Sequence, residues 1–256
     1  MGRIIAIANQ KGGVGKTTTA INLSATLAEA GQKVLAVDFD PQGNETSGFG
    51  VEKNQLEQTV YELLIGECKV SDCLIKEVQP NLDLIPSNVN LAGAELELLV
   101  MENKEKILRG FLRRLRKNYD FIIIDCPPSL SLLTVNALVA ADTVLVPLQC
   151  EYYALEGLNQ VMKTIQLVKK GLNPKLEMEG VVFTMFDSRT NLSSEIVESV
   201  RENLNENIYN TMIHRNVRLA EAPSYGMPIT VYDTRSAGAE DYRMLAAEVI
   251  KRGEEL

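Results

Sequence analysis

The stretch Asn9-Gln10-Lys11-Gly12-Gly13-Val14-Gly15-Lys16-Thr17-Thr18 is the most informative part of the chain. The run before it, residues 4–8, is apolar, short and followed by a polar turn, which predicts a buried strand. The run after it, residues 20–28, has apolar side chains at helical spacing. A strand, a glycine-rich loop and a helix in this order predict a phosphate-binding loop. Glycines let the backbone approach an anion, and the amides at the helix start point towards it.

Two side chains of this loop have expected roles with a bound nucleotide. Lys16 is predicted to reach the β- and γ-phosphates, and the Thr17 hydroxyl to bind Mg²⁺. The match to Gly-x-x-x-x-Gly-Lys-Thr is loose, because no glycine stands where that pattern begins. A glycine-rich turn with chance lysines is the alternative, but the flanking strand and helix disfavour it. The predicted nucleotide-binding residues of the loop are Lys11, Gly12, Gly13, Val14, Gly15, Lys16, Thr17 and Thr18.

Length and composition bound the class of protein. The 256 residues favour a single domain, residues 1–256, and the 45% hydrophobic and 23% charged content is ordinary for a globular chain. No apolar run approaches the roughly 18 residues of a membrane span, and no basic-then-apolar leader precedes the first strand. The four cysteines lack Cys-x-x-Cys spacing, which indicates reduced thiols rather than a metal or disulfide role. We therefore expect a cytoplasmic protein.

Strands and helices are predicted to alternate along the chain. Strands are expected at residues 33–38, 82–86, 121–125, 143–147, 179–186 and 208–213. Helices are expected at residues 59–65, 91–101, 103–117, 155–169, 193–204 and 239–251, with residues 41–54 as a polar loop. This alternation predicts an α/β sandwich with a mostly parallel sheet, whose ligands bind beyond the carboxyl ends of the strands.

Three carboxylates stand at such strand ends. Asp38 and Asp40 alternate with period two, which places both on one side of the chain beside the phosphate loop, where they suit a metal and a water. Asp125 ends the apolar run 121–125 and is the natural acid to touch Mg²⁺, directly or through water. A cap or turn role stays open for each acid, because Asp is common at strand ends.

These motifs together resemble the deviant Walker-A ATPases of the ParA/MinD family, whose signature is Lys-Gly-Gly-x-Gly-Lys-[Thr/Ser]. The resemblance continues through residues 37–44, 125–129, 149–157 and 215–224, and is greatest to the short chromosomal ParA proteins called Soj. It implies a three-layer P-loop NTPase sandwich with a mostly parallel, twisted central sheet. It also implies an enzyme that hydrolyses ATP to ADP and phosphate with Mg²⁺.

The resemblance also implies roles for single residues. Lys11 is expected to reach across a two-fold homodimer to the partner's phosphates, and with Lys16 to stabilise the transferring charge. Asp40 would align the attacking water, while Thr17 holds Mg²⁺ and Asp38 and Asp125 complete the metal's water shell. The remaining nucleotide contacts would come from Glu151, across the dimer, and from Met185, His214 and Asn216, around the adenine.

One residue departs from the family pattern. His214, the only histidine of the chain, stands where the family usually has proline. A lone histidine without evident partners is interpreted as an ordinary loop residue rather than a titrating switch.

The implied function is an ATP-dependent partitioning switch. Its ATP-bound dimer would bind double-stranded DNA without sequence preference, associate with the nucleoid, and be released when a ParB-type partner stimulates hydrolysis. The net charge of −8 argues against a generic nucleic-acid binder, so a local patch must bind DNA. The family points to Arg189 and Arg218, which would meet phosphates without reading sequence. The rival location, residues 104–117, carries seven basic residues against one acid and is interpreted first as a solvated basic face.

Two other functions are weighed. A MinD-like regulator that cycles on the membrane needs a basic amphipathic C-terminal helix, whereas residues 251–256 end in acids, so no stable membrane association is expected. An iron-protein-like electron donor needs cluster-ligating cysteines, which the four cysteines do not match. No zinc finger is expected, and no segment before the first strand is long enough for a helix-turn-helix domain.

Overall fold

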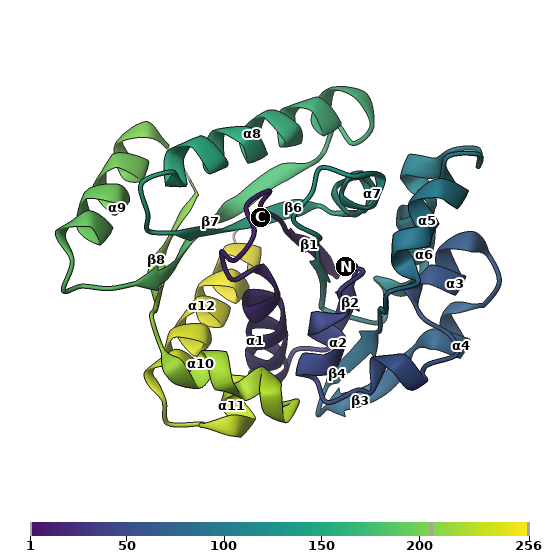
Figure 1. Cartoon of the computed structure of the whole chain (residues 1–256), viewed down its shortest axis with the longest axis horizontal. Coiled ribbons are helices and arrows are strands. Elements are labelled where there is room, and N and C mark those ends of the chain that lie inside the picture. The colour runs from purple at the N-terminus through teal and green to yellow at the C-terminus, as the bar shows by residue number, and fades with distance from the viewer. Residues whose placement is uncertain (1, 205–206, 255–256) are drawn as a thin grey trace.

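An eight-stranded sheet runs through the middle of the protein (Figure 1). The structure is a computed structural model that describes residues 2–204 and 207–254. The strand order is β3-β4-β2-β5-β1-β6-β7-β8, and every neighbouring pair is parallel except β3 with β4. The strands are β1 (Arg3–Ile7), β2 (Val34–Asp38), β3 (Ile75–Gln79), β4 (Leu82–Ile85), β5 (Phe121–Asp125), β6 (Thr143–Gln149), β7 (Glu177–Phe186) and β8 (Ile208–His214).

Helices cover both faces of this sheet (Figure 1). The longer ones are α1 (Lys16–Glu29), α5 (Leu91–Leu98), α6 (Ile107–Leu115), α7 (Leu132–Ala140), α8 (Ala154–Gly171), α9 (Asn191–Asn203) and α12 (Ala237–Glu254). The short ones are α2 (Asn44–Gly48), α3 (Val60–Ile65), α4 (Val70–Cys73), α10 (Val217–Glu221) and α11 (Ile229–Tyr232). Single 3₁₀ turns are η1 (Lys53–Gln55), η2 (Lys104–Lys106) and η3 (Ala222–Tyr225). The predicted three-layer α/β sandwich is therefore confirmed.

The alternation of side chains along the strands creates two separate cores. Ile5 and Ile7 of β1 face α1 and α12, which lie side by side, whereas Ile4 and Ala6 face the layer that contains α7 and α8. All four side chains are at most 2% exposed. A strand buried on both faces must be apolar at every position, which is why the central strands appear in the sequence as unbroken apolar runs.

Several predicted boundaries are wrong, and several elements were not predicted. The third predicted strand is β4, and β3 beside it was missed because this edge strand keeps Lys76 and Glu77 exposed and interrupts its register. Helix α7 was missed because it is buried on almost all sides, which removes the polar face that gives a helical period.

The predicted loop 41–54 and the helix 103–117 also need correction. The loop contains α2, a helix too short to show a period. The helix is divided, because Asn103 has a left-handed backbone and a 3₁₀ turn precedes α6. In the same way, the helix predicted at 91–101 ends at Leu98. In residues 2–204 and 207–254, no helix is long and apolar enough to cross a bilayer.

Candidate active site

The glycine-rich loop connects β1 to α1 and leaves an open concave backbone. Asn9 is buried and holds the start of the loop, since its Nδ2 donates to Pro147 O at 2.8 Å and its Oδ1 accepts from Lys11 N at 3.0 Å. Gly13 and Gly15 have φ of 76° and 85°, which favour glycine. A Cβ built on Gly12 or Gly13 would meet nothing within 4 Å, so the space beside these amides is free for an anion.

Lys16, the first residue of α1, lies inside this concavity. It is only 7% exposed, and its Nζ donates to the backbone oxygen of Lys11 at 3.0 Å. Burial lowers the pKa of Lys16, and the charge of Asp125 acts in the opposite direction. The ammonium therefore folds back over the loop, where it can donate to a bound phosphate instead.

The register of the sheet brings the predicted metal acids together. Asp38 and Asp125 are partners at the ends of the neighbouring strands β2 and β5, and both are fully buried. Thr17 Oγ1 donates to Asp125 Oδ2 at 2.6 Å, while Asp38 Oδ2 accepts from Thr46 N at 2.8 Å and from Thr46 Oγ1 at 2.7 Å. Burial raises the pKa of Asp38 to about 6 and raises the pKa of Asp125 well above its ordinary value.

A third acid, which the sequence did not reveal, completes this cluster. Glu45 in α2 is fully buried, and a carboxylate oxygen of Glu45 lies within 4.8 Å of one from Asp38 and one from Asp125. Burial raises the pKa of Glu45 well above its ordinary value, and the charges of Asp125 and Asp38 add to this effect. Glu45 could not be recognised from the sequence as a member of this cluster, because it lies in a segment that looks like a polar loop.

These residues fit a magnesium ion. Asp125 Oδ1 and both carboxylate oxygens of Glu45 are buried and lack a hydrogen-bond partner within the described residues. Carboxylate and hydroxyl oxygens are the ligands that Mg²⁺ prefers. The Thr17 hydroxyl, which already contacts Asp125, faces the same place from the phosphate loop.

Asp40 lies just beyond the end of β2 and is 7% exposed. Its Oδ1 accepts from Gln42 N at 2.9 Å, which fixes the orientation of the carboxylate. No described residue donates a hydrogen bond to its second oxygen. Asp40 is therefore held in place with one oxygen ready to accept a hydrogen bond from water, as its predicted role requires.

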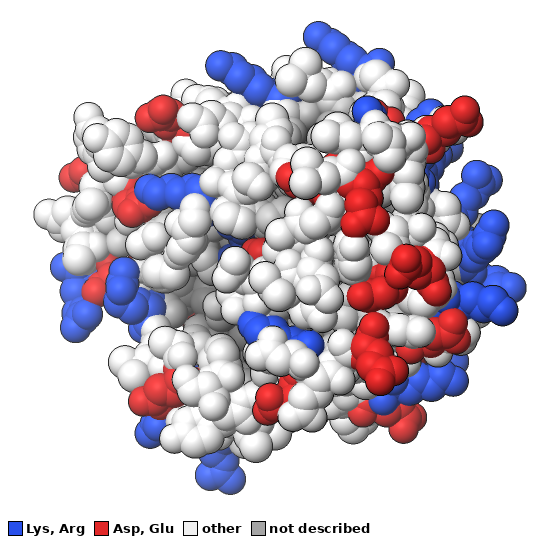
Figure 2. All heavy atoms as spheres, turned by 45° about the vertical axis from the view of Figure 1, so that its right-hand side comes forward, with Lys and Arg blue, Asp and Glu red and all other residues white. Residues whose placement is uncertain are grey.

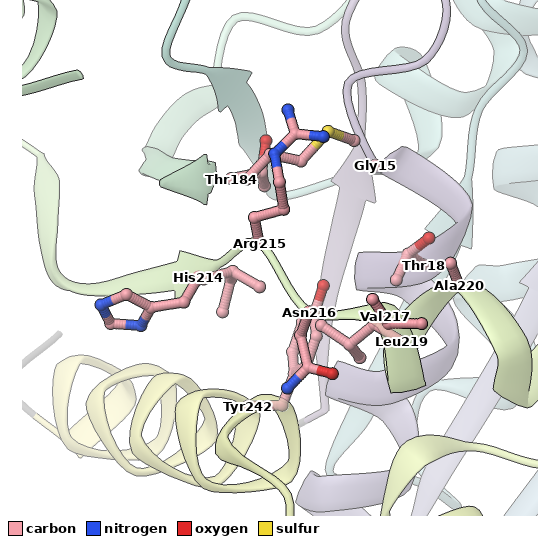
Figure 3. A pocket seen from close by; sticks show the side chains of 12 residues that line it. Gly15, Thr18, Thr184, His214, Arg215, Asn216, Val217, Leu219, Ala220 and Tyr242 are labelled. Carbon is pink, nitrogen blue, oxygen red and sulfur yellow. The ribbon is translucent and has the colours of Figure 1, made fainter. Parts of the chain in front are cut away.

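The residues predicted to frame the adenine line one cavity of about 430 Å³ beside the loop (Figure 3). Met185 follows from the end of β7, His214 ends β8, and Asn216 caps α10 by accepting from Arg218 N. Gly15 and Thr18 line the same cavity and connect it to the phosphate loop. Arg215, from the loop predicted to frame the adenine, also lines the cavity. The remaining lining residues were not predicted: Thr184, Ile213, Val217, Leu219, Ala220 and Tyr242.

The interpretation of His214 as a histidine without partners is wrong. His214 Nδ1 lies 3.0 Å from Oδ2 of Asp241, and its backbone N donates to the same carboxylate oxygen at 2.8 Å. The ring is half exposed, whereas the carboxylate of Asp241 is buried. This partner could not be recognised because α12, which carries Asp241, is distant in sequence.

Lys11 and Glu151 form an ion pair within one chain. Both side chains are about one-third exposed, and the Lys11 ammonium also lies 5.8 Å from the centre of the Tyr153 ring. Tyr152 and Tyr153 next to Glu151 are 77% and 61% exposed. Large aromatic side chains that remain exposed in a group are typical of protein interfaces.

The two arginines predicted to bind DNA are each paired with acids. Arg189 is 84% exposed, and its guanidinium donates to both carboxylate oxygens of Asp187, at 2.8 and 2.7 Å. This pairing holds the pKa of Asp187 well below its usual range. Arg218 donates to Glu221 at 2.9 Å and lies 3.5 Å from Asp233. A DNA phosphate would therefore have to compete with these carboxylates.

The rival basic segment has a different arrangement. Arg116 turns inward to Asp142, at 2.9 Å, and to the backbone of Gly2. Arg113 and Arg114 in α6 and the neighbouring Lys117 are exposed and pair with no acid within the described residues. Figure 2 shows basic side chains gathered along one edge of the molecule, with acidic side chains close beside them.

Comparison with known proteins gives consistent matches over almost the whole length. Residues 2–178 match a family described as AAA domain. The chain is 55% identical over 253 residues to the sporulation initiation inhibitor protein Soj of Bacillus subtilis (strain 168), covering 99% of this chain and 100% of that protein. It is 49% identical over 252 residues to the chromosome-partitioning ATPase Soj of Treponema pallidum (strain Nichols), covering 98% of both chains.

A solved structure with a bound nucleotide analogue is also similar. It is the cobyrinic acid a,c-diamide synthase from Mycobacterium smegmatis with bound ATP analogue and magnesium. The two structures superpose with a TM-score of 0.88 and 37% sequence identity, covering 99% of this chain and 96% of the other.

Proposed function

The chain belongs to the ParA/MinD family of deviant Walker-A ATPases, and from this membership we propose that it is a chromosome- or plasmid-partitioning ATPase. ATP binding brings two chains together as a dimer, the dimer binds double-stranded DNA on the nucleoid without sequence preference, and a ParB-type partner stimulates hydrolysis and release. The observation that carries the proposal is Lys11, which adds a second lysine at the exposed rim of a phosphate loop that already holds Lys16.

Hydrolysis depends on positioning and charge. When bound, Mg²⁺ supplies positive charge against the phosphate oxygens. Lys16 donates to the transferring phosphoryl group, and Asp40 orients the attacking water through its second oxygen. Thr17 and the acids Asp38 and Asp125, which lie together, would hold the metal.

Dimerisation uses the rim of the site. In one chain Lys11 pairs with Glu151, and we propose that ATP in the partner chain provides phosphate oxygens that replace this carboxylate. Glu151, once released, would contact the partner's nucleotide. The exposed Tyr152 and Tyr153 become buried in the interface.

DNA binding requires the dimer, because a chain of net charge −8 with acid-paired arginines attracts duplex weakly. Doubling the number of phosphate contacts on one surface adds to the logarithm of the affinity. We assign the contacts to Arg189 and Arg218, with residues 104–117 as the competing surface. The pairing of Arg189 with Asp187 implies that removing the acid strengthens binding.

The alternative, a MinD-like regulator that cycles on the membrane, is disfavoured by the last described turns of α12. Arg252 does not face solvent as part of a basic stripe, because it donates to Glu179 O at 3.1 Å and Ile208 O at 2.8 Å and stacks 3.9 Å from the Tyr209 ring. The predicted effect of the acidic tail also rests on Glu255, which lies outside the described residues.

The test of this function is a titration of nonspecific duplex DNA at several salt concentrations, with ATP and with ADP. We expect binding only with ATP, the same affinity for unrelated sequences, and a steep decrease with salt. Equal affinity with ADP would count against the proposal. ATP turnover measured with DNA and a candidate ParB-type protein, added alone and together, then tests the stimulation.

Matched variants locate the contacts. Lys11→Ala should bind nucleotide but remain monomeric in light scattering and lose DNA binding. Arg189→Ala and Arg218→Ala should dimerise normally but bind DNA more weakly, with a flatter salt dependence, whereas Asp187→Asn should bind more tightly. A larger loss from neutralising Arg113, Arg114 and Lys117 would instead place DNA on the basic segment.

A further inference from the structure

Glu45 is held in the interior by the local backbone. The preceding Gly43 has φ of 59°, and a Cβ there would lie 2.7 Å from Ser87 O, so only glycine fits this turn. The turn starts α2, in which Glu45 and Thr46 are both fully buried. The side chain of Glu45 therefore cannot reach solvent without displacing the helix.

The Glu45 carboxylate has no partner to offset the cost of its burial. Neither of its oxygens accepts a hydrogen bond from any described residue, and the nearby Asp125 Oδ1 lacks one as well. A buried carboxylate without hydrogen bonds or a counter-charge is strongly destabilising. Something other than the described side chains must therefore satisfy these oxygens, and the three possible groups are a proton, a water molecule or a cation.

The arrangement of the acids matches the requirements of a cation. Asp38, Glu45 and Asp125 each offer one carboxylate oxygen, and these atoms lie within 4.8 Å of one another. Octahedral Mg²⁺ with ligands at about 2.1 Å separates opposite ligands by about 4.2 Å, and the longer bonds of Ca²⁺ widen this spacing further. Three carboxylates at this spacing can therefore bind one ion directly.

Two of the three acids are already oriented for this purpose. Asp38 Oδ2 is occupied by Thr46, but its Oδ1 accepts only one bond, from Asp40 N at 3.2 Å. Asp125 uses Oδ2 for Thr17 and keeps Oδ1 unpaired. Each acid thus presents a second oxygen, and the oxygens of Glu45 complete the set.

We propose that Glu45 makes this cluster a direct divalent-cation site, which binds a metal ion before any nucleotide arrives. Asp38 and Asp125 alone would hold magnesium through its waters, with the phosphates as the main ligands. With the third carboxylate, the protein alone supplies enough ligands to bind the ion. The ion then lies directly below the phosphate loop, beside the Thr17 hydroxyl. This inference is independent of the partitioning role, because it concerns the chain without nucleotide, DNA or partner.

The test is a titration of the full chain, freed of metal and nucleotide, with Mn²⁺, followed by the electron paramagnetic resonance signal of the free ion. We expect the wild-type chain to bind a single Mn²⁺, and Mg²⁺ to compete for it. Glu45→Gln keeps the shape but removes the charge, and should weaken Mn²⁺ binding by about tenfold or more. Glu57→Gln, at an exposed acid outside the cluster, should leave the affinity unchanged.

A stability measurement provides the second readout. Without metal, Glu45→Gln should melt at a higher temperature than the wild type, because it removes a buried carboxyl group that no hydrogen bond satisfies. Adding Mn²⁺ should raise the melting temperature of the wild type much more than that of the variant. The proposal is overturned if the wild-type chain binds no Mn²⁺ without nucleotide, or if Glu45→Gln binds it equally well. Should Glu45→Gln fail to fold, Glu45→Asp takes its place, with the same expected weakening.

Discussion

The proposed nucleotide site has two ends that differ in construction. At the phosphate end, buried side chains such as Lys16 and Asp125 are fixed by short contacts within a few residues of the strand ends. At the base end, partly exposed side chains such as Met185 and His214 lie in the last residues of β7 and β8. The difference indicates that the phosphate end supplies affinity and chemistry, whereas the base end mainly adds shape. Substitutions at the phosphate end should therefore have the larger effects.

The largest effect is expected from Asp40→Ala. Removing the carboxylate that orients water should decrease ATP turnover by about 100-fold or more. Nucleotide affinity should stay unchanged, because the loop and its lysines remain intact, so the variant accumulates as an ATP-bound dimer. Single-turnover hydrolysis and light scattering measure the two quantities, and hydrolysis at the wild-type rate would remove Asp40 from the mechanism.

Lys16→Ala should come next, with an effect on binding. Two charge-assisted hydrogen bonds to phosphate are lost, worth about 3 kcal/mol together, so the affinity for ATP should decrease by about 100-fold. Titration with a fluorescent nucleotide measures this change. Lys11→Ala serves as the control, because its lysine faces the rim rather than the floor of the loop, and equal losses in both variants would contradict this distinction.

Met185→Ala tests the base end. The side chain is partly buried in the cavity wall, and removing its apolar contact with a base should cost about 1 kcal/mol, or about fivefold in affinity. The same titration with ATP and with inorganic triphosphate distinguishes the contribution of the base end from that of the phosphate end. Only the binding of ATP should weaken. A loss of ATP affinity as large as that of Lys16→Ala would show that the base end contributes as much to affinity as the phosphate end.

His214→Ala should have the smallest effect. It removes the half-exposed ring contact with Asp241 but keeps the backbone hydrogen bond to the same carboxylate. Because the ring is half exposed, solvent weakens this contact, so the affinity should change by less than about fivefold. The same nucleotide titration measures this change, and a loss as large as that of Lys16→Ala would contradict the expectation.

Prediction from sequence succeeded where a local pattern was sufficient. The central strand 121–125 was predicted with its observed bounds, because a strand buried on both faces has an unbroken apolar run. The phosphate loop, Asp38 and Asp125 could be found because each lies directly at a strand end. Prediction failed for α7, which is buried on almost all sides, and for the edge strand β3, whose polar residues face solvent.

The sequence by itself therefore determined the order of all strands except β3, the loop predicted to bind phosphate and the acids at the ends of β2 and β5. These features depend on neighbours along the chain. Only the tertiary structure decided which distant charges meet. It placed Glu45 against Asp38 and Asp125, and it paired Lys11 with Glu151, His214 with Asp241 and Arg218 with Asp233. Such contacts depend on how separate elements pack across the sheet, because a charge interacts through space with whatever folding brings near it.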